Sequence, residues 1–129
     1  MALKWDEKYE VGHARIDAEH QIFLGLIIDF KSAIDNDAPR EKLLRILKEV
    51  EKYAEFHFVS EENIMIDVGY PEKEKHTVIH NHLLAELHDQ NQQFKAKVSS
   101  AESIFEFLFE WFALHTSNED KKLAHYITQ

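Results

Sequence analysis

Cysteine is absent from this sequence of 129 residues, and glycine and proline are scarce, with 3 and 2 residues. The missing thiols exclude disulfide bonds, thiolate metal sites and cysteine nucleophiles. The scarcity of glycine and proline leaves few turn signals for a sheet of many strands. No apolar run is long enough to span a bilayer, so we predict no membrane insertion.

Positive charge is also in short supply, with 15 Lys and Arg against 24 Asp and Glu and a formal net charge of −9. Binding to nucleic acid or to an anionic membrane needs clustered basic side chains, so we expect neither partner. The N-terminus turns polar at Lys4 and shows no signal-peptide pattern, which predicts a cytoplasmic location. The abundant residue is histidine, with 9 copies.

Apolar residues recur at helical spacing in four stretches, approximately 18–36, 40–66, 72–98 and 102–118, after an irregular N-terminal arm at 1–16. Asp17 is the expected N-cap of the first helix, and Pro39 suits the opening of the second. The length suits a single domain over 1–129. We therefore predict an all-α fold, an antiparallel up-down-up-down four-helix bundle with short loops.

Two pairs of candidate metal ligands lie four residues apart. His57 precedes Glu61 on the expected second helix, and His76 precedes His80 on the third. Residues at i and i+4 share one face of a helix, so each pair can bind one centre.

Single candidates lie on the other two helices, where His20 and His115 stand alone. Two carboxylates follow His115. Asp120 comes five residues later, which on a regular helix turns its side chain about 140° away, so it joins the site only if the helix loosens or ends there. Glu119, at i+4, is the geometric rival, and spacing alone leaves both open.

Several candidate ligands are expected to face the core, because large apolar residues lie at +3 and +4 from them, or at −4 and −3 in the case of His115. Phe23 and Leu24 follow His20 in this way, and Leu83 and Leu84 follow His80. Buried unpaired polar groups cost about 1–3 kcal/mol each, and a buried carboxylate without a cation costs more. Counted from the loops that their helices share, the candidates also lie at similar depth in the bundle. Such a layer needs positive charge, which metal ions supply.

The donor set restricts the metal. Five imidazoles and two carboxylates are too many for one tetrahedral zinc ion. They suit two ions with octahedral preference that share carboxylates, and a set without thiolates fits iron or manganese.

These motifs resemble those of the hemerythrin family, the bacterial hemerythrins in particular, over nearly the whole chain. The matching segments are Asp17-Ala18-Glu19-His20, His57 to Met65, Tyr70-Pro71 ahead of His76 and His80, and Trp111 to His115 with Asp120. The resemblance implies two iron ions with an oxo or hydroxo bridge, held by His20, His57, Glu61, His76, His80, His115 and Asp120.

The resemblance also implies a role for each ligand. The histidines of the third and fourth helices would complete the coordination of one iron. His20 and His57 would hold the other iron, which keeps one coordination position open. Glu61 and Asp120 would bridge the two ions, which favours Asp120 over Glu119. Dioxygen would bind at the open iron as a hydroperoxide. The expected pocket residues are Trp111, Phe112, Phe23 and Leu24, and Phe112 stands where relatives often carry leucine.

The function implied is reversible oxygen binding for carriage, storage or delivery to an oxygen-consuming enzyme, by a chain that we expect to be a monomer and not itself an enzyme. The alternatives are a diiron oxidoreductase that reduces peroxide or nitric oxide or oxidises ferrous iron, an oxygen sensor module, and a structural bundle with zinc or no metal. An oxidase would need an acid–base group beside the open iron, and the sequence offers no clear one. His13, His82, His88 and His125 are expected to be exposed or structural.

Overall fold

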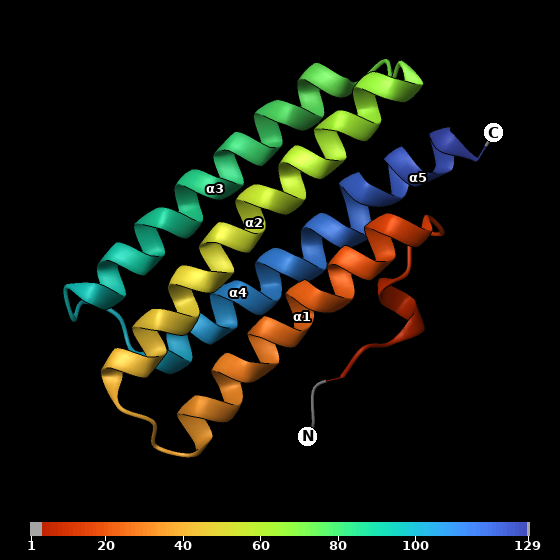
Figure 1. Cartoon of the computed structure of the whole chain (residues 1–129). Helices are drawn as coiled ribbons and strands as arrows, with labels where there is room; N and C mark the ends of the chain where they lie inside the picture. Colours follow the sequence, from red (N-terminus) through yellow and green to blue (C-terminus); the bar gives the residue numbers. More distant parts are fainter. Residues whose placement is uncertain (1–3, 129) are drawn as a thin grey trace.

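The computed structural model describes residues 4–128, without the side chains of residues 116 and 117. Its long helices run antiparallel in chain order: α1 (Ala14–Asp35), α2 (Arg40–Val68), α3 (Lys73–Lys95) and α4 (Ala101–His115) (Figure 1). α1 and α3 each pack on both α2 and α4, so the four form a closed ring. The predicted all-α four-helix bundle is confirmed.

The first helix begins earlier than its sequence suggests. His13 is the N-cap of α1, and its Nδ1 accepts a hydrogen bond from the backbone N–H of Ile16 at 3.2 Å. The prediction that Asp17 caps this helix is wrong, because its carboxylate turns back to the arm. It accepts from the backbone N–H groups of Val11 at 2.8 Å and Gly12 at 3.2 Å. The irregular arm, which includes the short helix η1 (Glu7–Tyr9), therefore ends at His13.

The other helix ends follow from local backbone geometry. Gly69 adopts a left-handed conformation with φ 63°, which suits glycine, and ends α2. α3 ends at Lys95, three residues before the expected boundary, and Lys97 follows in a left-handed turn with φ 64°. The fourth helix gives way after His115 to a five-residue π segment, η2 (Thr116–Asp120), and then to α5 (Lys121–Ile127).

Two apolar clusters fill the interior at different levels. The larger cluster contains buried rings and aliphatic side chains from all four long helices, among them Phe23, Phe58, Leu87 and Leu108. The smaller cluster joins Ile16, Met65, Tyr70 and Leu123. Along every helix, the predicted metal ligands lie between residues of the larger cluster and residues of the smaller one or the turn beside it. The bundle therefore has a polar layer between two apolar ones.

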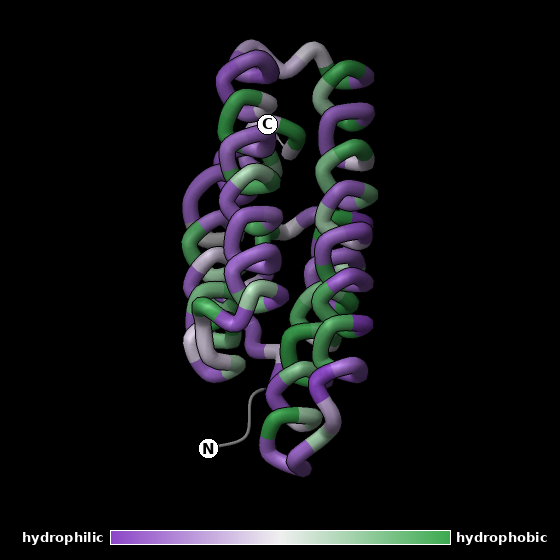
Figure 2. Tube along the Cα trace, turned by 90° about the vertical axis from the view of Figure 1, so that its left-hand side faces the viewer, coloured by the Kyte–Doolittle hydropathy of each residue, from purple (hydrophilic) through white to green (hydrophobic). Residues whose placement is uncertain are grey.

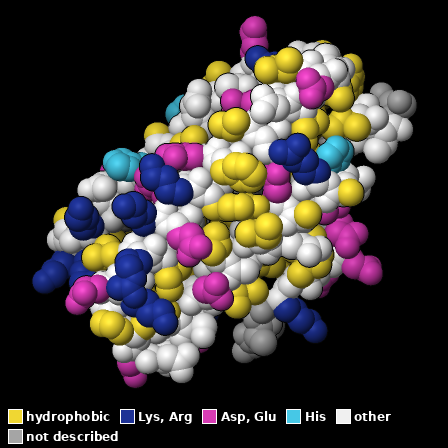
Figure 3. All heavy atoms as spheres, viewed as in Figure 1, with side chains coloured by type: hydrophobic (Ala, Val, Ile, Leu, Met, Phe, Trp, Pro, Cys, Tyr) yellow, Lys and Arg dark blue, Asp and Glu magenta, His cyan; other side chains and the backbone are white. Residues whose placement is uncertain are grey.

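The surface pattern agrees with this interior. Hydrophilic and hydrophobic residues alternate along each helix (Figure 2). On the face shown in Figure 3, Lys and Arg side chains gather near the end where α2 begins and α3 ends. Within residues 4–128, no helix is long and apolar enough to cross a membrane.

Candidate metal centre

The seven predicted ligands meet in the polar layer. α1 contributes His20, α2 contributes His57 and Glu61, and α3 contributes His76 and His80. His115 is the last residue of α4, and Asp120 is the last residue of the π segment. All seven are buried, and none exposes more than 7% of its surface. Their donor atoms form two overlapping groups, each compact enough to hold one metal ion.

The first group contains three imidazoles and two carboxylate oxygens. The Nε2 atoms of His76 and His80 lie 3.3 and 2.9 Å from Glu61 Oε1. On the other side, the Nε2 atoms of His76 and His115 lie 3.3 and 2.9 Å from Asp120 Oδ1. We call this group the three-histidine site.

The second group contains two imidazoles and the remaining oxygen of each carboxylate. His20 Nε2 lies 2.7 Å from Asp120 Oδ2, and His57 Nε2 lies 3.2 Å from Glu61 Oε2. The two Nε2 atoms are 3.1 Å apart. We call this group the two-histidine site. Each carboxylate thus turns one oxygen to each site, which is the arrangement needed to bridge two cations.

The electrostatics of the centre are those of a buried cluster of imidazoles and carboxylates. Burial opposes the charged form of His76 and His115, yet Asp120 and Glu61 raise the pKa of His76 to about 9 and that of His115 to about 10. Burial likewise opposes charge on His57, but Glu61 and Glu19 raise its pKa well above the usual value. Burial would raise the pKa of Asp120, and attraction to His115 holds it well below its usual range instead. Burial and the nearby Asp120 would raise the pKa of Glu61, but attraction to His57 holds it well below its usual range. Both carboxylates therefore favour the ionised form and attract positive charge.

Unpaired polar atoms show that these residues fit a metal centre. Both Asp120 oxygens, Glu61 Oε2 and His115 Nε2 are buried without a well-aligned hydrogen bond. Buried polar groups in proteins are normally satisfied, and leaving a charged one unsatisfied is costly. Cations between the two carboxylates would satisfy these atoms. Imidazoles and carboxylates without thiolates are ligands suited to iron or manganese.

The π segment explains how Asp120 reaches the centre. In a π turn the backbone bonds from i to i+5, which widens the helix locally and brings residues five apart to the same side. Asp120 is fully buried and lies 2.9 Å from His115. Its rival Glu119 is partly exposed and instead lies 3.7 Å from Lys122. The structure therefore places Asp120, and not Glu119, beside His115.

An outer carboxylate that the sequence interpretation missed orients His57. Glu19 Oε1 lies 2.7 Å from His57 Nδ1, and its other oxygen accepts hydrogen bonds from Ser60 Oγ at 2.8 Å and Arg15 Nε at 3.2 Å. Burial would raise the pKa of Glu19, but the hydrogen bonds from His57 and Ser60 lower it. The available signal was spacing, because Ile16 at −3 and Phe23 at +4 place Glu19 on the core side of α1.

A second outer carboxylate serves the three-histidine site. Glu62 Oε2 lies 2.9 Å from His80 Nδ1, and the ring of Phe58 stacks on the His80 ring with centroids 3.9 Å apart. These contacts fix which ring nitrogen of His80 faces the centre. The position of Glu62 four residues after Phe58 was again the sequence signal.

A small apolar cavity adjoins the centre. Its volume is about 10 Å³, and its lining residues are His20, Phe23, His57, Phe58, Trp111, Phe112 and His115. Three of the four expected pocket residues are in this lining, but Leu24 is buried in the core beyond it. Phe112 stands edge-on to His20 with ring centroids 5.9 Å apart, and Tyr9 of the arm packs behind it at 5.5 Å. The cavity has room for about one water-sized molecule.

The fold and the centre together define a class of protein: a four-helix bundle with a buried, carboxylate-bridged histidine site for cations. Comparison with known proteins specifies the family. The hemerythrin HHE cation-binding domain matches residues 11–127. The chain therefore belongs to the hemerythrin family, which confirms the resemblance read from its motifs.

Individual relatives agree with this assignment. A myohemerythrin of Theromyzon tessulatum is 31% identical over 119 residues, covering 92% of this chain and 88% of the relative. A bacteriohemerythrin of Clostridium acetobutylicum is 23% identical, with 92% and 95% of the two chains covered. The crystal structure of a hemerythrin mutant has the same fold, with a TM-score of 0.87, 21% identity and full coverage of both chains.

Proposed function

We propose that this chain holds two iron ions and binds dioxygen reversibly at the two-histidine site, as a module for oxygen carriage, storage or delivery. The observation that carries the proposal is the unequal division of ligands. One site has three imidazoles and the other has two, while both share Glu61 and Asp120. The ion with fewer protein ligands keeps a position for a small molecule.

The position of the apolar cavity supports this division. It contacts both histidines of the two-histidine site, His20 and His57, but only His115 of the three-histidine site. When bound, the iron pair would supply the electrons and the open coordination position for dioxygen. The protein would contribute Glu61 and Asp120 as shared ligands and a ring of aromatic side chains that limits water. Excluding water slows the irreversible oxidation of the metal, because an apolar shell controls solvent access.

An enzymatic role has less support from the cavity. Its lining contains three histidines, all of them in the proposed ligand set, and four aromatic residues that are Phe or Trp. No additional acid or base belongs to that described lining, whereas proton-coupled reduction of peroxide or nitric oxide would benefit from one. We therefore favour a binding protein, which an oxygen-consuming enzyme would use as a donor.

Oxygen titration of the reduced, iron-loaded protein tests this proposal. We expect two irons per chain and a visible absorption band that appears with dioxygen and disappears when oxygen is removed. Iron content below two after loading would contradict the diiron assignment. Rapid, irreversible oxidation without the band would contradict reversible binding and favour the oxidoreductase or iron-storage alternatives.

A matched pair of variants locates the oxygen site. His20→Ala removes a ligand of the two-histidine site, and His76→Ala removes one of the three-histidine site, from equally buried positions. If oxygen binds at the two-histidine site, His20→Ala abolishes the band even where one iron is retained. Preservation of the band in His20→Ala with its loss only in His76→Ala would reverse the assignment.

A further inference from the structure

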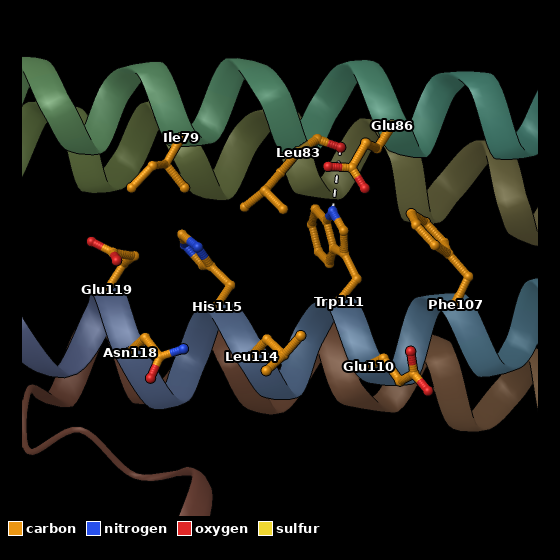
Figure 4. A pocket seen from close by; sticks show the side chains of 10 residues that line it. All are labelled: Ile79, Leu83, Glu86, Phe107, Glu110, Trp111, Leu114, His115, Asn118 and Glu119. Atoms are coloured by element: carbon orange, nitrogen blue, oxygen red, sulfur yellow. Dashed lines mark hydrogen bonds between the residues drawn. The ribbon is translucent and has the colours of Figure 1, made fainter.

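A surface groove between α3 and α4 leads to the metal centre from outside. Its volume is about 350 Å³, and its lining residues are Ile79, Leu83, Glu86, Phe107, Glu110, Trp111, Leu114, His115, Asn118 and Glu119. Figure 4 shows Glu119 and His115 side by side on the α4 side, opposite Ile79, with Glu86 over Trp111 from α3. The groove differs from the apolar cavity in that it carries carboxylates.

Apart from His115, the charged side chains that line the groove are all carboxylates. Glu86, Glu110 and Glu119 belong to its lining, which includes no Lys or Arg among these described residues. The charged residues that line the groove between α2 and α3, of about 520 Å³, are mostly basic: Arg45, Lys48, Lys52 and Lys95, with one carboxylate, Glu51. Clefts lined by one sign of charge concentrate ions of the other sign and raise their association rates. A divalent cation is therefore drawn to the α3–α4 side.

His115 connects the groove to the centre. It lines the groove, while its Nε2 lies 2.9 Å from Asp120 Oδ1 inside the three-histidine site. The residue is 7% exposed, and both of its ring nitrogens are buried without a hydrogen-bond partner. An imidazole at the floor of an acidic groove is positioned to receive an arriving ion. The same wall carries Glu119, which directly precedes the bridging residue Asp120.

We propose that the α3–α4 groove is a transient binding site for divalent cations and the route by which iron loads the centre. Glu110 and Glu119, which lie nine residues apart, attract the ion to the groove, and His115 accepts it as the first ligand of the three-histidine site. The inference rests on the proposed metal centre and extends it to the path of the metal. The apolar cavity, which has no carboxylate in its described lining, would not attract a hydrated cation.

Lys122 forms an ion pair with Glu119 of the groove. Its Nζ lies 3.7 Å from Glu119 Oε1, and the lysine side chain is 53% exposed. Exposed pairs of this kind are weak, so an arriving dication can displace the ammonium. The lysine then competes with the metal for Glu119, and its removal should accelerate loading.

Stopped-flow uptake of Co²⁺ by the full-length, metal-free chain tests the proposal, because cobalt in a histidine–carboxylate site absorbs visible light. At about 0.1 M salt, where the Debye length is about 10 Å, we expect the double variant Glu110→Gln, Glu119→Gln to load about tenfold more slowly than the wild type, while Lys122→Gln loads faster. In about 1 M salt the difference should shrink, because the Debye length falls to about 3 Å. The final content should stay at two ions per chain in every variant.

The matched control is Glu102→Gln, which removes an exposed carboxylate from the same helix. It lies thirteen residues from His115, or about 20 Å at 1.5 Å per residue, beyond the Debye length at about 0.1 M salt. If the double variant loads two ions as fast as this control, the groove is not the route although the centre stands. If the wild-type chain binds fewer than two ions at equilibrium, the centre itself fails, and the route fails with it.

Discussion

Replacing Glu19 with Gln should weaken the binding of one metal ion and leave the binding of the other unchanged. Glu19 contacts only His57 among the proposed ligands, with 2.7 Å between Oε1 and Nδ1, and the contact is buried. The substitution keeps the size and a hydrogen-bond acceptor but removes the negative charge that makes His57 a more basic ligand. Loss of such a partner typically costs 10- to 100-fold in metal affinity, or about 1.4–2.7 kcal/mol. Because burial keeps the charge unscreened, we expect a loss towards the upper end.

The structure supplies a matched comparison in Glu62→Gln. Glu62 has the same relation to His80 in the three-histidine site, at 2.9 Å, but its side chain is 28% exposed. Water around Glu62 replaces part of its effect, so we expect a loss of about tenfold or less. Of the five proposed imidazole ligands, His57 and His80 have a carboxylate at Nδ1, whereas the Nδ1 atoms of His20, His76 and His115 are buried without a partner.

Titration of the loaded variants with a competing chelator measures both affinities, since the two ions should leave in separate phases. Glu19→Gln should lower the affinity of the two-histidine site, and Glu62→Gln should lower that of the three-histidine site. The assigned role of Glu19 is refuted if both variants lower the affinity of the same site, or if Glu19→Gln leaves both release phases as in the wild type.

Three further outcomes are expected. Phe112→Leu enlarges the cavity beside His20 and should speed irreversible oxidation of the oxygenated protein several-fold by admitting water, as the decay of its visible band would show; an unchanged decay rate would contradict the role of Phe112. Glu61→Ala removes a ligand of both sites and should lower iron to less than one ion per chain, so metal analysis that still finds two irons would remove Glu61 from the centre. Since the pKa is about 9 for His76 and about 10 for His115, and that of His57 is raised, metal uptake at pH 7 should release protons from these imidazoles, and affinity should fall as the pH falls; an indicator dye that detects no release would exclude this charge state.

The sequence was informative wherever a helix stayed regular. The stripe of apolar residues at +3 and +4 predicted that His20 and His80 face inward, and the structure buries both. The same rule could not decide between Glu119 and Asp120, because it assumes an unbroken α-helix. The π segment breaks that assumption, and nothing local in Thr116–Asp120 announces it. Only the family resemblance favoured Asp120 in advance.

Contacts between different segments account for most of the remaining differences. Aspartate is a common N-cap residue, but the carboxylate of Asp17 accepts hydrogen bonds from Val11 and Gly12 once the arm folds back. Glu19 was visible as a core-side residue, yet its function depends on His57, 38 positions away. The helical extension α5 went unpredicted, and its stability comes from packing of Leu123 against the smaller apolar cluster. Spacing within one helix does not contain these partners.

The π segment also ties the C-terminal turns to the metal. One extra residue in a helical turn rotates all that follows, so the face that α5 presents is set within the same five residues that aim Asp120. That face buries Leu123 and Ala124, and Tyr126 donates to the backbone oxygen of Gly69 at 3.3 Å. Shortening the chain just beyond Asp120 would thus remove the packing that holds this proposed ligand in place. A partner that binds residues 121–127 could therefore change the position of Asp120 without contacting the centre.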